Sequence, residues 1–259
     1  MIRFENLTLG YDARILLDHI SASVDGGRLV ALLGRNGTGK STLLRAAAGL
    51  GKVQGGNIFL SERNIASLKA AELAQIVSFV TTERIRIPNL RCEDVVALGR
   101  SPYTNWLGQI QKQDREIVAQ ALSLVGMSDY ALRTMDQMSD GECQRIMIAR
   151  ALAQDSPIIL LDEPTAFLDL PNRYELCLLL QDLAVKEGKC ILFSTHDLDI
   201  ALSLCDSIML IDNPSLYCLP TSEMVDSGHI ERLFQNDAVT FDVKEQVVRI
   251  KNRGADSLR

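Results

Sequence analysis

The sequence predicts an α/β fold with a parallel central sheet, a strand-rich N-terminal part and a helical segment inserted in the middle. Two short apolar strands, 157–161 and 189–193, flank an amphipathic stretch over 172–186, which is the β-α-β pattern of a parallel sheet. Residues from about 92 to 153 carry little strand pattern and instead place apolar residues at helical spacing. A chain of 259 residues with 47% hydrophobic residues is large enough to bury a core around such a sheet.

The N-terminal part alternates apolar and polar residues as half-buried strands do, over 2–9 and again over 20–24. The fully apolar run 29–33 predicts a strand that is buried on both faces. Residues 40–50 suit a helix, which the glycines at its end would terminate. The chain therefore passes from a buried strand through a glycine-rich loop into a helix.

Further along the chain, three stretches of the insert show helical spacing, namely 93–98, 115–125 and 141–153. After the two apolar strands, 207–211 predicts one more strand. The tail from about residue 221 contains a short helical piece, and apolar runs on either side of Lys244 and Glu245 predict a terminal hairpin. We expect one domain over 1–259, with a helical subdomain over about 90–155 and a C-terminal extension over about 221–259.

Charge and composition exclude several classes of protein. The 27 Lys and Arg against 33 Asp and Glu give a net charge of -6, so no overall positive field draws the chain to nucleic acid. No apolar run approaches the roughly 18 residues of a membrane helix, and the N-terminus lacks the apolar region of a signal peptide. Six scattered cysteines without a C-x-x-C pair indicate reduced, mostly buried thiols.

Residues 34–41 read GRNGTGKS, which matches G-x-x-x-x-G-K-[ST] between the predicted buried strand and the helix. The glycines let successive backbone N–H groups turn toward a phosphate, and the N-terminus of the helix adds its positive dipole end. Lys40 supplies a charge for the β and γ phosphates, and the Ser41 hydroxyl suits Mg²⁺. The nucleotide-binding residues predicted here are Gly34, Arg35, Asn36, Gly37, Thr38, Gly39, Lys40, Ser41 and Thr42.

A second motif, IILLDEP over 158–164, is an apolar strand that ends in two adjacent acids. Burying carboxylates costs free energy unless a cation accompanies them, and a bound Mg²⁺ provides that compensation. We expect Asp162 to contact the metal and Glu163 to act as the base that polarises the attacking water. The alternative is an acid pair that only caps a helix after the strand.

The third motif, MSDGE over 138–142, precedes a predicted helix. Ser139 and Glu142 form the S-x-x-E pattern of a capping box. Ser139, Gly141 and a free helix N-terminus also make a second anion site in addition to the phosphate loop. Two phosphate sites on one chain suggest a nucleotide that is shared between two chains.

Taken together, these motifs resemble those of the ATP-binding cassette (ABC) ATPases, from about residue 2 to about residue 225. MSDGE stands where that family has its LSGGQ signature, 167–169 resembles the D-loop with Asp169, and 194–197 resembles the H-loop with His196. Tyr11 stands where the family stacks an aromatic ring on adenine, although packing alone would also explain it. The resemblance implies a P-loop NTPase core with an antiparallel N-terminal β part, ATP and Mg²⁺ as cofactors, and Lys40, Glu163 and His196 as catalytic residues.

What the resemblance implies for partners is a head-to-tail homodimer, with each ATP between Lys40 of one chain and Ser139 with Gly141 of the other. GRSPYTNW over 99–106 is similar to a segment of ATPases that serve importers of iron-siderophore complexes, haem and cobalamin, where it faces the membrane permease. We therefore expect an energy-coupling importer subunit on the cytoplasmic face of the membrane, held by the permease and acting indirectly on a cargo-binding protein. The alternatives are a soluble ATPase of an assembly system, such as iron-sulfur cluster biogenesis, and a polar loop at 99–106 without a partner.

The sequence departs from the family pattern at two places. The Q-loop glutamine is replaced by Thr82, which we expect on the metal side, with Glu83 as the longer competitor. Asp140 replaces the first glycine of the signature and would bring a carboxylate near the triphosphate. At 4 Å and an effective dielectric near 20 such a contact costs about 4 kcal/mol, so Asp140 should point away or meet a cation. We expect Glu83, with Arg84 and Arg86, on the coupling surface.

Overall fold

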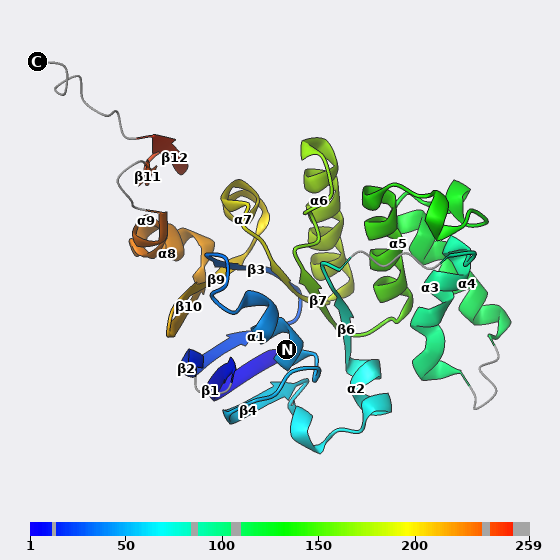
Figure 1. Ribbon diagram of the computed structural model, residues 1–259, viewed down its shortest axis with the longest axis horizontal. Coiled ribbons are helices and arrows are strands. Elements are labelled where there is room, and N and C mark those ends of the chain that lie inside the picture. Colours follow the sequence, from blue (N-terminus) through cyan, green and yellow to red (C-terminus); the bar gives the residue numbers. More distant parts are fainter. Residues whose placement is uncertain (12–13, 84–87, 105–109, 235–238, 251–259) are drawn as a thin grey trace, which may run out of the picture.

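The N-terminal part forms a four-stranded antiparallel sheet in the order β2-β1-β4-β5. The computed structural model describes residues 1–11, 14–83, 88–104, 110–234 and 239–250 (Figure 1). The strands are β1 (Ile2–Tyr11), β2 (Arg14–Val24), β4 (Gly55–Leu60) and β5 (Arg63–Asn64). Burial alternates along β1, as period-2 patterning requires of a sheet with one covered face.

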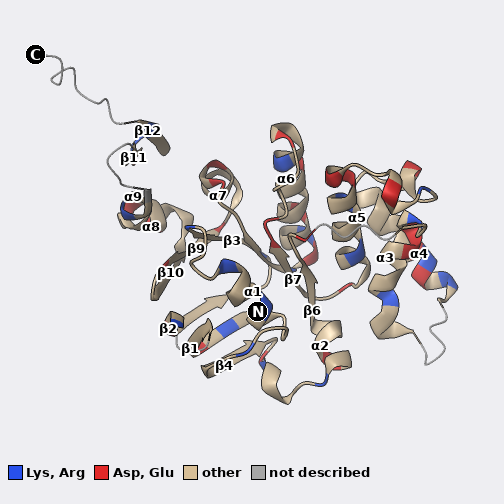
Figure 2. Ribbon diagram, in the orientation of Figure 1, with Lys and Arg blue, Asp and Glu red and all other residues tan. Residues whose placement is uncertain are grey.

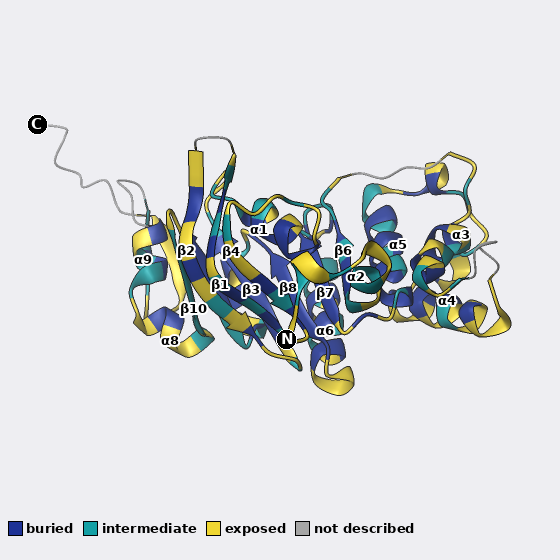
Figure 3. Cartoon of the chain, turned by 90° about the horizontal axis from the view of Figure 1, so that it is seen from below, coloured by how far each residue is buried: buried dark blue, intermediate teal, exposed yellow. Residues whose placement is uncertain are grey.

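The central sheet has six strands in the order β10-β9-β3-β8-β7-β6. All neighbours run parallel except the β9–β10 pair, which is antiparallel. Residues of β7 and β8 are buried throughout because layers cover both faces of the sheet (Figure 3). The bounds are β3 (Arg28–Gly34), β6 (Val77–Val80), β7 (Ile158–Asp162), β8 (Cys190–Ser194), β9 (Ser207–Asp212) and β10 (Ser215–Pro220).

Helices gather at both ends of this sheet (Figure 1). α3, α4 and α5 lie beyond β6, whereas α8 and α9 lie beyond β10 with the hairpin of β11 (Val239–Asp242) and β12 (Val247–Ile250). The helices are α1 (Lys40–Ala47), α2 (Ala70–Ile76), α3 (Cys92–Ala97), α4 (Lys112–Leu124), α5 (Asp140–Ala153), α6 (Leu170–Glu187), α7 (Leu198–Leu204), α8 (Thr221–Asp226) and α9 (His229–Phe234). Short 3₁₀ helices are η1 (Ile65–Ser67), η2 (Leu98–Tyr103), η3 (Ser128–Tyr130) and η4 (Met135–Gln137).

The apolar strand β3 contributes side chains to both of the hydrophobic cores found among the described residues. Val30 and Leu32 join the core between the two sheets, which also holds the buried side of α1. Leu29, Ala31 and Leu33 face the other way, into the core that continues under α5 and α6. This division follows from the alternation of side chains across a strand.

The parallel register brings the carboxyl ends of three strands to one edge. Ser194 at the end of β8 pairs with Asp162 at the end of β7 and with Leu32 near the end of β3. Loops that follow these ends therefore meet at the same edge, where ligands of open α/β sheets bind. The α/β class with a parallel sheet and an antiparallel N-terminal part is confirmed, although α2, α7 and β10 were not expected from the sequence.

Charges of both signs are interspersed over the helical end formed by α3, α4 and α5 (Figure 2). Among the described residues, no helix combines the length and apolar character needed to cross a membrane. Arg84, Arg86, Asn105 and Trp106, on which parts of the predicted coupling surface rest, lie outside the described residues.

Candidate functional site

The glycine-rich loop joins β3 to α1 and takes backbone conformations that favour glycine. Gly37 and Gly39 have φ values of 77° and 107°, in the left-handed region. A Cβ atom on Gly34 would lie 2.7 Å from Oγ1 of Thr38, whereas one on Gly37 would face open space. The loop thus closes tightly at its start and stays open on the side where Gly37 lies.

Lys40 is the buried cation of this loop, with 6% of its surface exposed. Its Nζ donates hydrogen bonds to the carbonyl oxygens of Gly34 at 2.9 Å and Arg35 at 3.3 Å. Burial lowers the pKa of Lys40, and the nearby carboxylates of Glu163 and Asp162 oppose this by raising it. The ammonium group is therefore held inside the loop and close to both acids.

The N-terminus of α1 fits a phosphate. Its N-cap residue, Gly39, provides no side-chain hydrogen bond, and its first turn contains no acidic residue. The first N–H groups of a helix have no partner within the helix, so they and the dipole favour an anion. Together with Lys40, this end of α1 has the donor groups that a polyphosphate needs.

The two acids after β7 are organised by Ser194. Its Oγ donates to Oδ1 of Asp162 at 2.6 Å and accepts the backbone N–H of Glu163 at 2.9 Å. Asp162 is 4% exposed. Glu163 has a φ of 46°, a conformation that costs free energy for a non-glycine residue and is found mainly at functional sites. The chain therefore holds the second acid in a strained backbone conformation directly after the buried first acid.

His196 lies beside Glu163, with 3.8 Å between Nδ1 and Oε2. The histidine side chain is 59% exposed and that of Glu163 is 26% exposed. The backbone N–H of Thr195 donates to the carbonyl oxygen of Leu32, which fixes this loop against β3. The structure therefore brings Lys40, Glu163 and His196 together from three strand ends.

Thr82 follows β6 and its hydroxyl donates to the carbonyl oxygen of Asp162 at 2.9 Å. Glu83 instead pairs with Arg45 at 2.8 Å, on the exposed side of α1. Ser41 is an exposed residue of the first turn of α1. Of the two candidates for the missing glutamine, Thr82 is the one in contact with the acidic strand end.

Among the described residues, no group of three or more His, Cys, Asp and Glu is arranged to hold a metal ion. Mg²⁺ needs few protein ligands because it keeps several waters and takes phosphate oxygens. The Asp162 carboxylate and the Ser41 and Thr82 hydroxyls are oxygen donors of the kind it prefers. This donor set fits Mg²⁺ only together with the phosphates of a nucleotide.

Ser139 caps α5 as the S-x-x-E pattern predicted. Its Oγ and its backbone N–H each lie 2.8 Å from Oε2 of Glu142, and the backbone N–H of Glu142 donates to Oγ at 3.3 Å. Hydrogen bonds from the backbone and then the hydroxyl of Ser139 lower the pKa of Glu142. The capping interpretation is therefore confirmed for this helix end.

A cavity of about 470 Å³ lies at this end of α5 and is lined by Ser139, Asp140, Gly141 and Asp169 among others. Asp140 is the first residue of α5, where the helix dipole favours a carboxylate. Asp169 caps α6 by accepting the N–H of Asn172 at 3.2 Å. None of the phosphate-loop residues lines this cavity, so the two predicted anion sites are separate within one chain.

Tyr11 ends β1 with 61% of its surface exposed. Its hydroxyl lies 2.8 Å from Oγ1 of Thr42, which ties the end of the N-terminal sheet to α1. The ring is thus accessible next to the phosphate loop, as the stacking prediction requires.

Arg35 makes a contact with the C-terminal extension that the motif does not predict. Its Nε and Nη2 donate to the carbonyl oxygen of Leu233 in α9, at 3.1 and 2.7 Å. A cavity of about 370 Å³ is bordered by Gly34, Arg35, Asn36, His196 and, from the C-terminal extension, Leu233 and Val239. No local sequence signal points to this contact because 198 positions separate the two residues.

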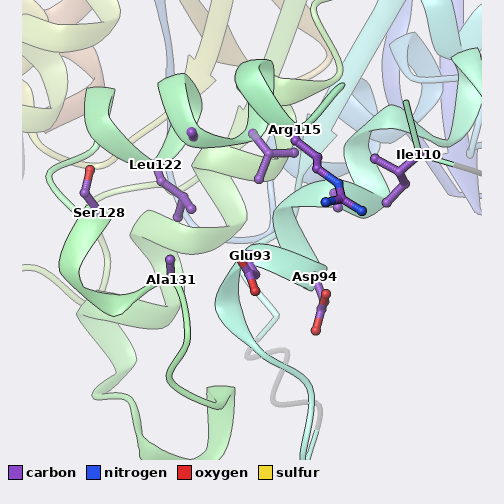
Figure 4. Close-up of a pocket in the computed structure, with 10 residues that line it drawn as sticks. Glu93, Asp94, Ile110, Arg115, Leu122, Ser128 and Ala131 are labelled. Carbon is purple, nitrogen blue, oxygen red and sulfur yellow. The ribbon is translucent and has the colours of Figure 1, made fainter. Parts of the chain in front are cut away.

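A further cavity, of about 420 Å³, lies away from these residues among the helices beyond β6. Glu93 and Asp94 of α3 lie on one side, and Arg115 and Leu122 of α4 on the other (Figure 4). It contains none of the predicted site residues.

Comparisons with known proteins agree with this geometry. The family model described as ABC transporter matches residues 17–166, more than half of the chain. The achromobactin transport ATP-binding protein of Dickeya dadantii is 35% identical over 91% of this chain and 88% of its own length. The iron(3+)-hydroxamate import ATP-binding protein of Bacillus subtilis is 31% identical over 90% of this chain and 87% of its own.

Two solved structures share the fold. One is described as an inward-facing ABC transporter of the metal-chelate type, with a TM-score of 0.79 and 29% identity over 90% of this chain and 88% of the other. The other is a dimeric bacterial ABC transporter cassette, with a TM-score of 0.76 and 27% identity over 85% of this chain and 99% of the other. The chain therefore belongs to the ABC transporter family as one of its ATP-binding subunits, which are ATPases.

Proposed function

We propose that the chain is the energy-coupling ATPase of an ABC importer whose cargo is a metal chelate, namely a ferric siderophore, haem or cobalamin. The observation that carries the ATPase part is the meeting of Lys40, Glu163 and His196 at one sheet edge beside the phosphate loop. Relatives named for achromobactin, petrobactin, hydroxamate and cobalamin transport support the cargo class. A soluble assembly ATPase is not favoured, since these relatives are transport proteins.

For nucleotide binding, the backbone N–H groups of the loop 34–41 and the start of α1 would hold the phosphates. Lys40 would leave the carbonyl oxygens of Gly34 and Arg35 to reach the β and γ phosphates. Thr42 would keep Tyr11 in place, with the exposed ring stacked on adenine. Ser41 and Asp162 would hold Mg²⁺, with Thr82 on the metal side.

For the reaction, bound ATP with Mg²⁺ supplies a scissile phosphoanhydride bond whose charge is already partly neutralised. Glu163, whose carboxylate lies beside His196, accepts a proton from the attacking water. His196 donates a hydrogen bond toward the γ-phosphate side and orients the water. Ser194 keeps the backbone of Glu163 and the carboxylate of Asp162 in fixed relation.

The assembly we propose is a head-to-tail homodimer. Within one chain the signature cavity with Ser139 and Gly141 shares no lining residue with the cavity at the phosphate loop, which supports a nucleotide bound between two chains. The second chain would place its Ser139, Gly141 and Asp169 against the nucleotide of the first. The dimeric cassette among the structural relatives supports this arrangement.

The membrane partner would be a permease that binds the surface around η2. Leu98 and Tyr103 are exposed there, at 50% and 38%. In this assembly the chain lies on the cytoplasmic face of the membrane and acts on a cargo-binding protein only through the permease. Nucleic acid is not a partner in this proposal, in keeping with the net charge of -6.

The test is reconstitution with a permease and a cargo-binding protein in lipid nanodiscs. We expect co-purification of the chain with the permease, and ATPase activity that a ferric siderophore, haem or cobalamin on the binding protein stimulates. The Glu163→Gln variant is the matched control, because it should co-purify and yet show no stimulation. Stable association with a soluble scaffold protein, and none with any permease, would reject the importer proposal.

A further inference from the structure

The C-terminal extension, which the structure describes over 221–234 and 239–250, contacts the phosphate loop at the side chain of Arg35. Both Nε and Nη2 of Arg35 donate to the carbonyl oxygen of Leu233. Leu233 is the last but one residue of α9, so its carbonyl belongs to the group that has no partner inside the helix. A guanidinium is a strong donor to such a carbonyl, since the helix dipole adds negative charge at this end.

The backbone carbonyl oxygen of Arg35 also accepts several hydrogen bonds within the loop. It accepts the N–H of Thr38 at 3.3 Å, the hydroxyl of Thr38 at 2.8 Å and Nζ of Lys40 at 3.3 Å. A nucleotide that draws Lys40 to its phosphates removes one of these donors. The side chain of Arg35 then remains as the outer support of the loop, because its bond to Leu233 does not involve the phosphates.

The extension is packed against the rest of the protein through buried apolar side chains. Ile230 is fully buried and Leu233 is 8% exposed, both within the core that covers one face of the central sheet. Phe241 of β11 is 3% exposed in the same core. The hydroxyl of Thr221, at the start of α8, donates to the carbonyl oxygen of Cys205 at 2.6 Å. The carbonyl oxygen that Arg35 binds therefore belongs to a well-packed element, which restrains the side chain of Arg35.

We propose that Arg35 is a positioning residue through which the C-terminal extension holds the phosphate loop in its nucleotide-binding shape. The inference rests on the proposed function of the loop and deepens it by assigning the extension a role in nucleotide affinity. Arg35 acts on the nucleotide through the loop backbone, and its guanidinium does not touch the phosphates. Its loss should weaken binding while leaving the catalytic groups Glu163 and His196 in place.

The experiment compares Arg35→Met, Arg35→Lys and wild type in the full-length chain. Arg35→Met should raise the Kd for ADP, measured by calorimetry, and the KM for ATP about fivefold, the change expected from losing one net hydrogen bond. The kcat should stay within about twofold, since uniform binding and not transition-state stabilisation is lost. Arg35→Lys keeps one charged donor nitrogen, so its Kd and KM should lie between those of Arg35→Met and wild type.

Hydrogen exchange supplies a readout that a general loss of stability would not reproduce. In the wild type, ADP should slow amide exchange across 229–233, and in Arg35→Met this dependence on ADP should vanish. Arg28→Met is the matched control, because Arg28 lies at the opposite end of β3 and pairs with Asp206 at 3.0 Å. It should change neither ADP affinity nor exchange in α9.

A double-mutant cycle with Leu233→Ala tests the connection from the side of the extension. Leu233→Ala keeps the carbonyl oxygen that Arg35 binds but removes the buried side chain that holds α9 in place. Less than additive effects of Arg35→Met and Leu233→Ala on the Kd for ADP are expected if the packing of α9 acts on the loop through Arg35. An unchanged Kd in Arg35→Met would overturn the inference, and so would additive effects of the two variants when each one alone raises the Kd. Lys40→Ala distinguishes failure of this inference from failure of the proposed function. If Lys40→Ala abolishes ADP binding while Arg35→Met leaves the Kd unchanged, the loop binds nucleotide and only the role of the extension is rejected.

Discussion

At the scale of single residues, Ser194 shows how one hydroxyl organises two acids. It donates to the carboxylate of Asp162 and accepts from the backbone of Glu163, so it ties the first carboxylate to the backbone of the second acid. Glu163 takes a left-handed backbone conformation at this point. The two roles that we propose, Asp162 on the metal and Glu163 on the attacking water, agree with these different contacts and backbone conformations.

Replacement of Lys40 and of Glu163 should have different consequences. Lys40→Ala should weaken ATP binding and hydrolysis together, because a buried cation is lost from the loop. Glu163→Gln should bind ATP normally and lower kcat by about 10²–10⁴, the usual contribution of a general base. Equilibrium binding and steady-state ATPase assays on both variants check this, and unchanged turnover in Glu163→Gln would reject the proposed base.

Thr82 and Glu83 should differ in the same way. Thr82→Val keeps the shape of the side chain and deletes the hydroxyl that donates to the carbonyl oxygen of Asp162. We therefore expect a lower Mg²⁺-dependent basal ATPase activity. Glu83→Ala breaks only an exposed pair with Arg45, worth about 0–1 kcal/mol, and should leave basal turnover unchanged. Mg²⁺ titration of the isolated protein measures both. A silent Thr82→Val with a slow Glu83→Ala would transfer the metal role to the glutamate.

At the scale of elements, the N-termini of two helices differ in how they are capped. α1 begins at Lys40 with uncapped N–H groups, whereas α5 begins at Asp140 after a complete capping box. Within the helical end, a buried pair joins η2 to α4: Nε of Arg100 donates to Oδ1 of Asp114 at 2.8 Å, with both side chains less than one tenth exposed. Arg100 also donates to the carbonyl of Ala153 at the end of α5.

Removal of the Ser139 hydroxyl should separate capping from function. Capping alone predicts a loss of about 1 kcal/mol in the free energy of unfolding for Ser139→Ala. If Ser139 also contacts the partner's nucleotide, ATPase activity should fall at least tenfold at a temperature where the variant is fully folded. Urea unfolding and ATPase assays are run on the same preparation, and normal activity with lower stability would leave capping as the whole role.

Asp114 gives an expected pH dependence. Its hydrogen bond from Arg100, followed by that from the backbone of Gln111, lowers the pKa of the carboxyl. A lowered pKa contributes stability above the unfolded-state value near 3.9, and this is lost as pH falls through the folded-state pKa. Asp114→Asn should therefore be less stable than wild type by about 3 kcal/mol at pH 7, because Arg100 is left buried without its partner. Urea unfolding from pH 7 to pH 3 should show this difference shrinking toward acid pH, and a constant difference would contradict it.

At the scale of the whole molecule, the arrangement of layers separates the two anion sites. The phosphate loop lies at the carboxyl edge of the central sheet, and the signature lies on α5 in the helical group beyond β6 (Figure 1). Their cavities share no residue. This separation agrees with the proposed dimer, in which a second chain completes each nucleotide site.

Mixing two inactive variants tests this arrangement directly. Lys40→Ala and Ser139→Ala homodimers each lack one half of both sites, whereas a mixed dimer contains one site with both halves intact. An equimolar mixture with random pairing should regain about a quarter of wild-type activity, since half of the dimers are mixed and each has one good site of two. Light scattering with MgATP confirms the dimer, and no recovery on mixing would argue against sites shared between chains.

Much of the fold and of the site was predictable from local sequence. The apolar runs of β3, β7 and β8 and the helical spacing of α4 and α5 stand where the sequence predicted them. The short helices α2 and α7 escaped because they are about two turns long and have little periodicity. The division into one domain with a helical insert over about 90–155 stays a prediction, as do the roles of the individual site residues.

The sequence by itself determined the chemistry near each motif, because a glycine-rich loop, a capping box and a strand ending in acids are set by neighbours a few positions apart. Tertiary structure alone decided which motifs meet. Only the parallel register of β3, β8 and β7 brings Lys40, His196 and Glu163 to one edge. Only packing of the C-terminal extension brings Leu233 to Arg35, since contacts over 198 positions depend on how the layers close and leave no local pattern.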